Sequence, residues 1–174
     1  MEPFADTPPD FDDPLGLLGA CHDRIRRHCE ILIRLGQRLV RDGPDAEVRE
    51  AAAAVHRYFA LAAANHHQDE ELDLFPLLRS DPELGALLDT LGGEHRAQEQ
   101  AWTRLAPGLA DPDAIDDPAA WARAAGAFAR DNLLHVETEN RLLLPRAAEM
   151  LDAAQLSGLG KAMARRRGTK DSRE

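Results

Sequence analysis

Aromatic residues are scarce in this chain of 174 residues, at 5% of the sequence, while alanine and leucine are abundant. This composition favours helices that pack through aliphatic contacts. Long hydrophobic runs are also missing: no stretch of about 18 uninterrupted apolar residues occurs, which excludes a predicted transmembrane helix. The length suits one domain with a sizeable core. We therefore predict an all-α domain with no membrane partner.

Positive charge is in deficit, with a formal net charge of −10. A general nucleic-acid-binding protein needs a basic surface, so we expect no nucleic-acid partner. Only the end of the chain departs from this pattern. Its basic residues are Lys161, Arg165, Arg166, Arg167, Lys170 and Arg173. We interpret them as a solvated basic tail.

Cysteine is nearly absent: Cys21 and Cys29 are the two in the sequence. Eight residues of helix separate them by about 12 Å, too far for a disulfide. The first 13 residues are acidic and rich in proline, and they lack the basic and apolar regions of a signal peptide. We predict a disordered acidic lead over residues 1–13 and a cytoplasmic protein with free thiols.

Proline, glycine and aspartate divide the rest of the chain into helical segments. The first helix begins at Asp13-Pro14 and ends at Asp42-Gly43-Pro44. Its predicted buried seam recurs at alternating steps of three and four residues and consists of Leu18, Cys21, Ile25, His28, Leu32, Leu35 and Leu39. The further helices are predicted from residue 46 to about 75, from about 82 to 105, from 118 to about 145, and over 153–166. The expected fold is an up-down-up-down four-helix bundle over residues 14–151, followed by a short helix and the basic tail over 152–174.

Two segments, His66–Pro76 and His135–Pro145, repeat one arrangement of histidine, glutamate and proline. In each, a glutamate follows the histidine by four residues and a proline follows it by ten. Positions i and i+4 share one face of a helix, so Glu70 lies beside His66 and Glu139 beside His135. Imidazole and carboxylate together suit first-row transition metals. The matched spacing predicts two halves of a metal site.

The turn near residue 43 tests whether other histidines reach the same level. His22 lies about as far before this turn as His66 lies after it, so an antiparallel hairpin places the two at nearly the same height. His28 falls about 10 Å nearer the turn, level with Tyr58 and Phe59. We assign His22 to the metal layer and His28 to the layer below it.

A weak internal repeat adds a further histidine. The separation from His22 to His66 is 44 residues, and that from His95 to His135 is 40. Two similar helical hairpins would therefore supply one central site, with His95 as the counterpart of His22.

Simpler interpretations apply to some of these residues. A single histidine on an apolar helix face is usually a core residue, which we expect for His28. We expect His56 and His67 to face solvent or the edge of a helix contact. Surface pairs at i,i+4 are common, but they explain neither the repeated spacing nor the apolar flanks. Buried carboxylates are costly unless they are paired or bind metal, so we favour a metal site.

Taken together, these residues resemble the hemerythrin-like, or HHE cation-binding, family over residues 14–150. The matching motifs are Cys21-His22-x-x-Ile25, His66-x-x-x-Glu70-Glu71-x-x-Leu74-Phe75-Pro76, Glu94-His95 and His135-x-x-x-Glu139-x-x-Leu142-Leu143-x-Pro145.

The resemblance implies a non-haem di-iron centre with two Fe ions inside a four-helix bundle. It implies that Glu70 and Glu139 bridge the irons. It also implies that His22 and His66 complete one iron, which keeps an open position for a small ligand. His95 and His135 would serve the other iron.

One position departs from the oxygen-carrying members of the family. They have a further histidine four residues after the one that matches His95, and here that position is Glu99. A carboxylate favours the ferric state and so disfavours reversible oxygenation. Glu99 is a candidate metal ligand, or else leaves a place for water. The halves also differ in that Asn140 stands where the first segment has Glu71.

Three functions follow as hypotheses. The first is a non-haem di-iron protein that binds or senses dioxygen, nitric oxide or peroxide, or that reports iron or redox state. The second, suggested by Glu99 and by Cys21 beside His22, is a di-iron enzyme for peroxide reduction or iron–sulfur cluster repair. The third is a metal-free helical interaction module whose basic tail contacts a partner.

Overall fold

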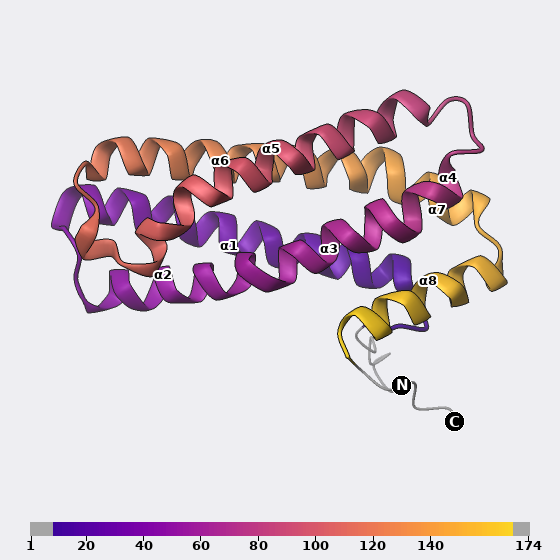
Figure 1. Cartoon of the computed structure of the whole chain (residues 1–174), viewed down its shortest axis with the longest axis horizontal. Helices are drawn as coiled ribbons and strands as arrows, with labels where there is room; N and C mark the ends of the chain where they lie inside the picture. Colours follow the sequence, from indigo (N-terminus) through magenta and orange to yellow (C-terminus); the bar gives the residue numbers. More distant parts are fainter. Residues whose placement is uncertain (1–8, 169–174) are drawn as a thin grey trace, which may run out of the picture.

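A computed structural model describes residues 9–168, and within this range the chain is all-helical with no strand (Figure 1). Its elements in chain order are α1 (Pro14–Asp42), α2 (Ala46–Tyr58), η1 (Phe59–Ala63), α3 (Ala64–Gln68), η2 (Asp69–Leu74), α4 (Phe75–Leu78), α5 (Gly85–Ala110), η3 (Pro112–Ala114), α6 (Pro118–Thr138), η4 (Glu139–Leu143), α7 (Leu144–Met150) and α8 (Ala153–Arg166). Residues 1–8 of the predicted acidic lead and residues 169–174 of the predicted tail lie outside the described residues. None of the described helices is long and apolar enough to cross a membrane.

Aspartate side chains begin several of these helices, as the sequence predicts. Asp13, Asp45 and Asp117 each accept a hydrogen bond from a backbone N–H in the first turn, which satisfies a donor that has no partner within the helix. Asp152 begins α8 in the same way, and its own backbone N–H donates a hydrogen bond to the side-chain oxygen of Gln155. The start of α1 and the bounds of α8 are therefore confirmed.

The two prolines of the repeated segments do not end their helices, contrary to the prediction. The chain stays helical past Pro76 to Leu78 and past Pro145 to Met150. In both places a π-helical stretch, η2 or η4, comes just before the proline. Proline lacks an N–H and its ring crowds the carbonyl four residues earlier. A π-helical turn inserts one residue and changes that register, so the helix continues.

The third long helix is also longer than predicted. It was expected to end near Leu105, but α5 continues through Pro107 to Ala110. Pro107 is exposed, and the predicted loop is reduced to a short 3₁₀ turn before Asp117.

The long helices lie along one axis (Figure 1), and the contacts between them form a closed ring. Helix α1 contacts α2 and α6, and α5 contacts both of these. A Cβ added at Gly36 would lie 3.2 Å from that of Ala122, so glycine permits the close approach of α1 and α6. The interior between these helices holds the functional residues.

Helix α8 packs at one end, against α1 and η2 (Figure 1). Two arginines at its end contradict the interpretation of the basic residues as a solvated tail. Arg166 pairs with Asp69 and lies 2.6 Å from Asp73, and Arg167 lies 2.6 Å from Asp69. Asp69 is fully buried, so these cations compensate a carboxylate that would otherwise be costly to bury.

Candidate metal centre

A layer of buried polar residues crosses the interior between two apolar clusters. On α1, Leu18 belongs to one cluster and Ile25 to the other, and His22 lies between them. Each of the other long segments contributes to the same layer. Its members are His22, His66, Glu70, His95, His135 and Glu139, each at most 3% exposed. The sequence predicted all six, and the structure brings them together.

These residues form two overlapping groups. One group is His22, His66, Glu70 and Glu139, and the other is Glu70, His95, His135 and Glu139. Within each group, the candidate ligand atoms lie within 4.8 Å of one another. Both groups share the two glutamates, so each carboxylate can serve two neighbouring positions with its two oxygens.

The contact distances show how the glutamates divide their oxygens. Oε1 of Glu70 lies 3.4 Å from Nε2 of His66, whereas Oε2 lies 3.3 Å from Nε2 of His95. Glu139 mirrors this, with Oε2 at 3.2 Å from Nε2 of His22 and Oε1 at 3.1 Å from Nε2 of His135. Each carboxylate therefore faces one histidine of each half.

The unsatisfied polar atoms of the layer fit a metal. All four oxygens of Glu70 and Glu139 are buried without a hydrogen bond of good geometry, as are both ring nitrogens of His66 and Nε2 of His22. Buried polar atoms are normally paired, because leaving one unpaired costs about 1–3 kcal/mol. A cluster of imidazoles and carboxylates converging in this way matches the ligands of first-row transition metals.

Charge coupling within the layer is strong. Burial alone would lower the pKa of His22, but Glu139 and Glu70 outweigh it and raise the pKa to about 10. His135 follows the same pattern, with burial opposed chiefly by Glu139, and its pKa rises to about 9. Burial would raise the pKa of Glu70, but His66, His22 and His95 hold it well below its usual value. His22 and His135 thus hold protons that a metal must displace.

The second nitrogens of three histidines have partners from other elements. Nδ1–H of His95 donates to Glu71 at 2.7 Å, and Nδ1–H of His135 donates to Glu94 at 2.6 Å. Such bonds orient the ring so that Nε2 faces the site. Nδ1 of His22 lies 2.7 Å from the side-chain amide of Asn140. The residue after each shared glutamate therefore supports the lone histidine of the opposite half.

This support differs in charge between the halves. His95 and His135 donate hydrogen bonds to the carboxylates of Glu71 and Glu94, whereas His22 contacts the neutral amide of Asn140. The position that matches Glu94 in the first half is Cys21, a buried free thiol. Burial would raise the pKa of Cys21, but the neighbouring His66 and Arg24 lower it overall. The His95–His135 half is the more anionic one.

Glu99 is not among the residues brought together. Its side chain is exposed, whereas Gln98, one residue earlier, points inward with 6% exposure. Residue i+3 lies on the face of His95, and here this position, rather than i+4, turns toward the interior. That spacing is the signal that could have identified Gln98 from the sequence.

Other histidines occupy the surroundings of the layer. The rings of His22 and His66 are 4.8 Å apart, and His28 stacks on Tyr58 at 3.8 Å, so both predicted levels are confirmed. The prediction for His67 was wrong: it is buried and stacks on His95 at 3.9 Å. Burial, and then the charge of His95, lower the pKa of His67 well below its usual value.

Comparison with known proteins agrees with this geometry. The chain is 29% identical over 162 residues to a protein of Haemophilus influenzae described as an uncharacterized protein, an alignment that covers 92% of this chain and 94% of the relative. The family model of the hemerythrin HHE cation binding domain matches residues 13–147. These residues include all six members of the buried layer, and the chain belongs to the hemerythrin HHE cation-binding domain family.

Proposed function

We propose that this protein is a non-haem di-iron protein that binds or senses dioxygen or a related small ligand such as nitric oxide or peroxide, or that reports iron or redox state. The observation that carries the proposal is the sharing of Glu70 and Glu139 by both groups of candidate ligands. Two separate mononuclear sites would need no common carboxylates, whereas a dinuclear centre needs bridges.

The ligand set also supports iron. His22 and His66 would hold one ion, His95 and His135 the other, and the two glutamates would connect them. Ferritin-like di-iron bundles rely mainly on glutamate, with a histidine three residues after a glutamate. Four histidines in place of carboxylates suit reversible ligand binding better than iron storage. Iron at this site would supply redox-active positions for a small ligand.

The fold and the thiols are consistent with this role. We propose that the ring of long helices is the up-down-up-down four-helix bundle that the sequence predicts. The two cysteines are buried and free, as expected in a reducing cytoplasm, where we place the protein.

Anaerobic loading with ferrous iron tests the proposal. After removal of loose metal, we expect two irons per chain and an optical change on exposure to dioxygen. Fewer than one tightly bound iron per chain, or no optical response to dioxygen, nitric oxide or peroxide, would contradict it.

The same sample separates binding from catalysis. Peroxide is supplied in large excess, and consumption by the wild type is compared with that of His66→Ala. A binding or sensing protein consumes about one equivalent per site. Sustained turnover that His66→Ala abolishes would instead favour the di-iron enzyme.

A further inference from the structure

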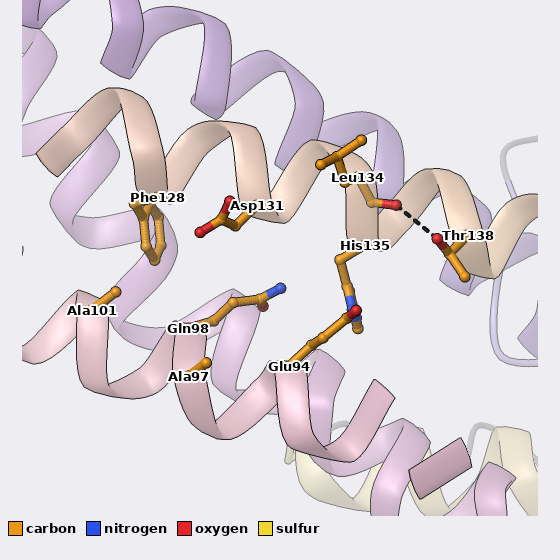
Figure 2. A pocket seen from close by; sticks show the side chains of 9 residues that line it. All are labelled: Glu94, Ala97, Gln98, Ala101, Phe128, Asp131, Leu134, His135 and Thr138. Carbon is orange, nitrogen blue, oxygen red and sulfur yellow. Dashed lines mark hydrogen bonds and ion pairs between the residues drawn. The ribbon is translucent and has the colours of Figure 1, made fainter. Parts of the chain in front are cut away.

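A cavity of about 230 Å³ adjoins the layer on the side of His135 (Figure 2). It lies between α5 and α6. Ala97, Asp131 and Leu134 are exposed at its rim, whereas Gln98 and His135 are buried. The cavity therefore leads from the surface to one histidine of the candidate metal centre.

Gln98 is the unusual residue of this cavity. Its side chain extends from α5 toward the space between Asp131 and His135 (Figure 2). Both polar atoms of its amide are buried, and neither has a hydrogen-bond partner. An amide buried in this state is costly unless something else occupies its donor or acceptor.

Gln98 also lines a second cavity, of about 100 Å³. His67 and Glu99 also line that space, and Phe128 is common to both cavities. The Gln98 amide thus stands where two cavities meet, beside the half of the layer that contains His95 and His135.

Resting on the proposed di-iron function, we propose that the small ligand binds on the His95–His135 side of the centre, where it enters through this cavity and accepts a hydrogen bond from the Gln98 amide. This reverses the expectation from the family resemblance, which assigned the open position to the His22–His66 side. Because Glu99 is exposed, the His95–His135 half has two histidines and no third terminal ligand, as the His22–His66 half does. The adjoining cavity and the unpartnered donor both lie on the His95–His135 side.

The lining also selects the class of ligand. Two carboxylates, of Glu94 and Asp131, line the cavity, and the other side chains are largely apolar, with Phe128 and Leu134 among them. Carboxylates repel anions, and the small volume excludes large molecules. The ligand class that fits is a small uncharged molecule such as nitric oxide or dioxygen.

Stopped-flow binding of nitric oxide to the ferrous-loaded protein tests this inference. Gln98→Leu keeps the size of the side chain and removes its donor, so we expect about tenfold faster dissociation of nitric oxide. Ala97→Phe fills the entrance, so it should slow association without changing the iron content. Gln100→Leu, at an exposed position on the same helix, is the matched control and should behave as the wild type.

Iron content distinguishes failure of the inference from failure of the proposed function. If wild type and variants hold two irons while Gln98→Leu and Ala97→Phe leave both rates unchanged, the ligand binds elsewhere and the inference is overturned. If Gln98→Leu loses iron, the association rate of Ala97→Phe alone tests the inference, because Ala97 is exposed and lies outside the layer. An unchanged association rate in Ala97→Phe then overturns the inference. A wild type that holds no iron refutes the proposed function, and the inference with it.

Discussion

Glu70 and Glu139 are the residues on which a shared centre depends. Each faces histidines of both halves at 3.1–3.4 Å, so loss of either carboxylate removes a ligand from both positions. We predict that Glu139→Gln reduces iron from two per chain to less than one, as measured by elemental analysis after gel filtration. Glu137→Gln, an exposed change on the same helix, should retain both irons. Two independent sites would instead lose one iron in Glu139→Gln.

The carboxylates behind the histidines should tune the two positions differently. Glu94→Gln removes the anion that accepts Nδ1–H of His135. Partners of this kind typically account for about 10–100-fold in metal affinity. We therefore expect the more weakly bound iron of the variant to bind about 10–100-fold more weakly than in the wild type. Competition with a chelator measures it. Glu99→Gln is the matched control, because Glu99 is exposed on the same helix, and an equal loss there would show that Glu99 is a ligand after all.

Protonation of the layer gives the metal-free protein a distinct pH dependence. His22 has a folded pKa of about 10 and His135 of about 9, both above the unfolded value near 6.5. Their protonated forms therefore stabilise the fold fully below about pH 6.5. This contribution is lost as pH rises through 9 to 10.

We predict that the free energy of unfolding of the chelated protein falls by about 6 kcal/mol between pH 7 and pH 10, with His22 contributing the larger share. Urea unfolding in the presence of a chelator measures this change. His22→Asn should show a shallower slope. Iron affinity should move the opposite way and rise with pH, since binding displaces the same protons. A flat stability profile in wild type would contradict the assigned ion pairs.

At the level of elements, the π-helical turns η2 and η4 carry the two shared glutamates. Glu70 lies in η2 and Glu139 begins η4, and π-helical turns are often found at functional sites. Helix α8 reinforces η2 through Arg166 and Arg167, which contact the buried Asp69 next to Glu70. The end of α8 therefore contacts the residue that precedes the shared glutamate Glu70.

Removing both arginines should expose the cost of burying Asp69. We expect Arg166→Ala with Arg167→Ala to destabilise the protein by about 3–5 kcal/mol in urea unfolding, because an uncompensated carboxylate remains. Adding Asp69→Asn should recover part of this loss. Arg165→Ala, an exposed change on the same helix, should change stability by less than about 0.5 kcal/mol. Equal effects at Arg165 and at the arginine pair would argue against the contact.

Local signals explain which parts were predictable from sequence. Aspartate caps depend on one side chain and the adjacent turn, so the starts of α1, α6 and α8 were evident. The i,i+4 spacing and the equal distance from the turn likewise identified the layer. The continuation past Pro76 and Pro145 was not evident, because proline normally ends a helix and no sequence pattern indicates the π-helical turns that precede these two.

The burial of individual polar residues was the other feature that the sequence did not predict. His67 follows no repeat, and its inward direction depends on how its helix packs. Gln98 shares a helix face with His95 through the i+3 spacing, but Glu99 at i+4 fits that face equally well by spacing alone. Asp69 is buried where Arg166 and Arg167 contact it from the end of α8. These contacts join residues distant in sequence, so no local pattern indicates them.

Across the whole molecule, the polar layer separates two apolar clusters that contain most of the buried leucines. The clusters pack the helices together on either side of the layer, and the candidate ligands converge between them. Because the two carboxylates are shared, four histidines and two glutamates should take up both metal ions as one unit.

X-ray absorption at the iron edge of the loaded protein tests this claim most directly. Carboxylate-bridged ions in one site should lie about 3.5–4 Å apart. We predict two irons per chain with clear iron–iron scattering in that range, in an environment of nitrogen and oxygen ligands. Tightly bound iron without any iron–iron scattering, or a single iron per chain, would contradict a shared dinuclear centre.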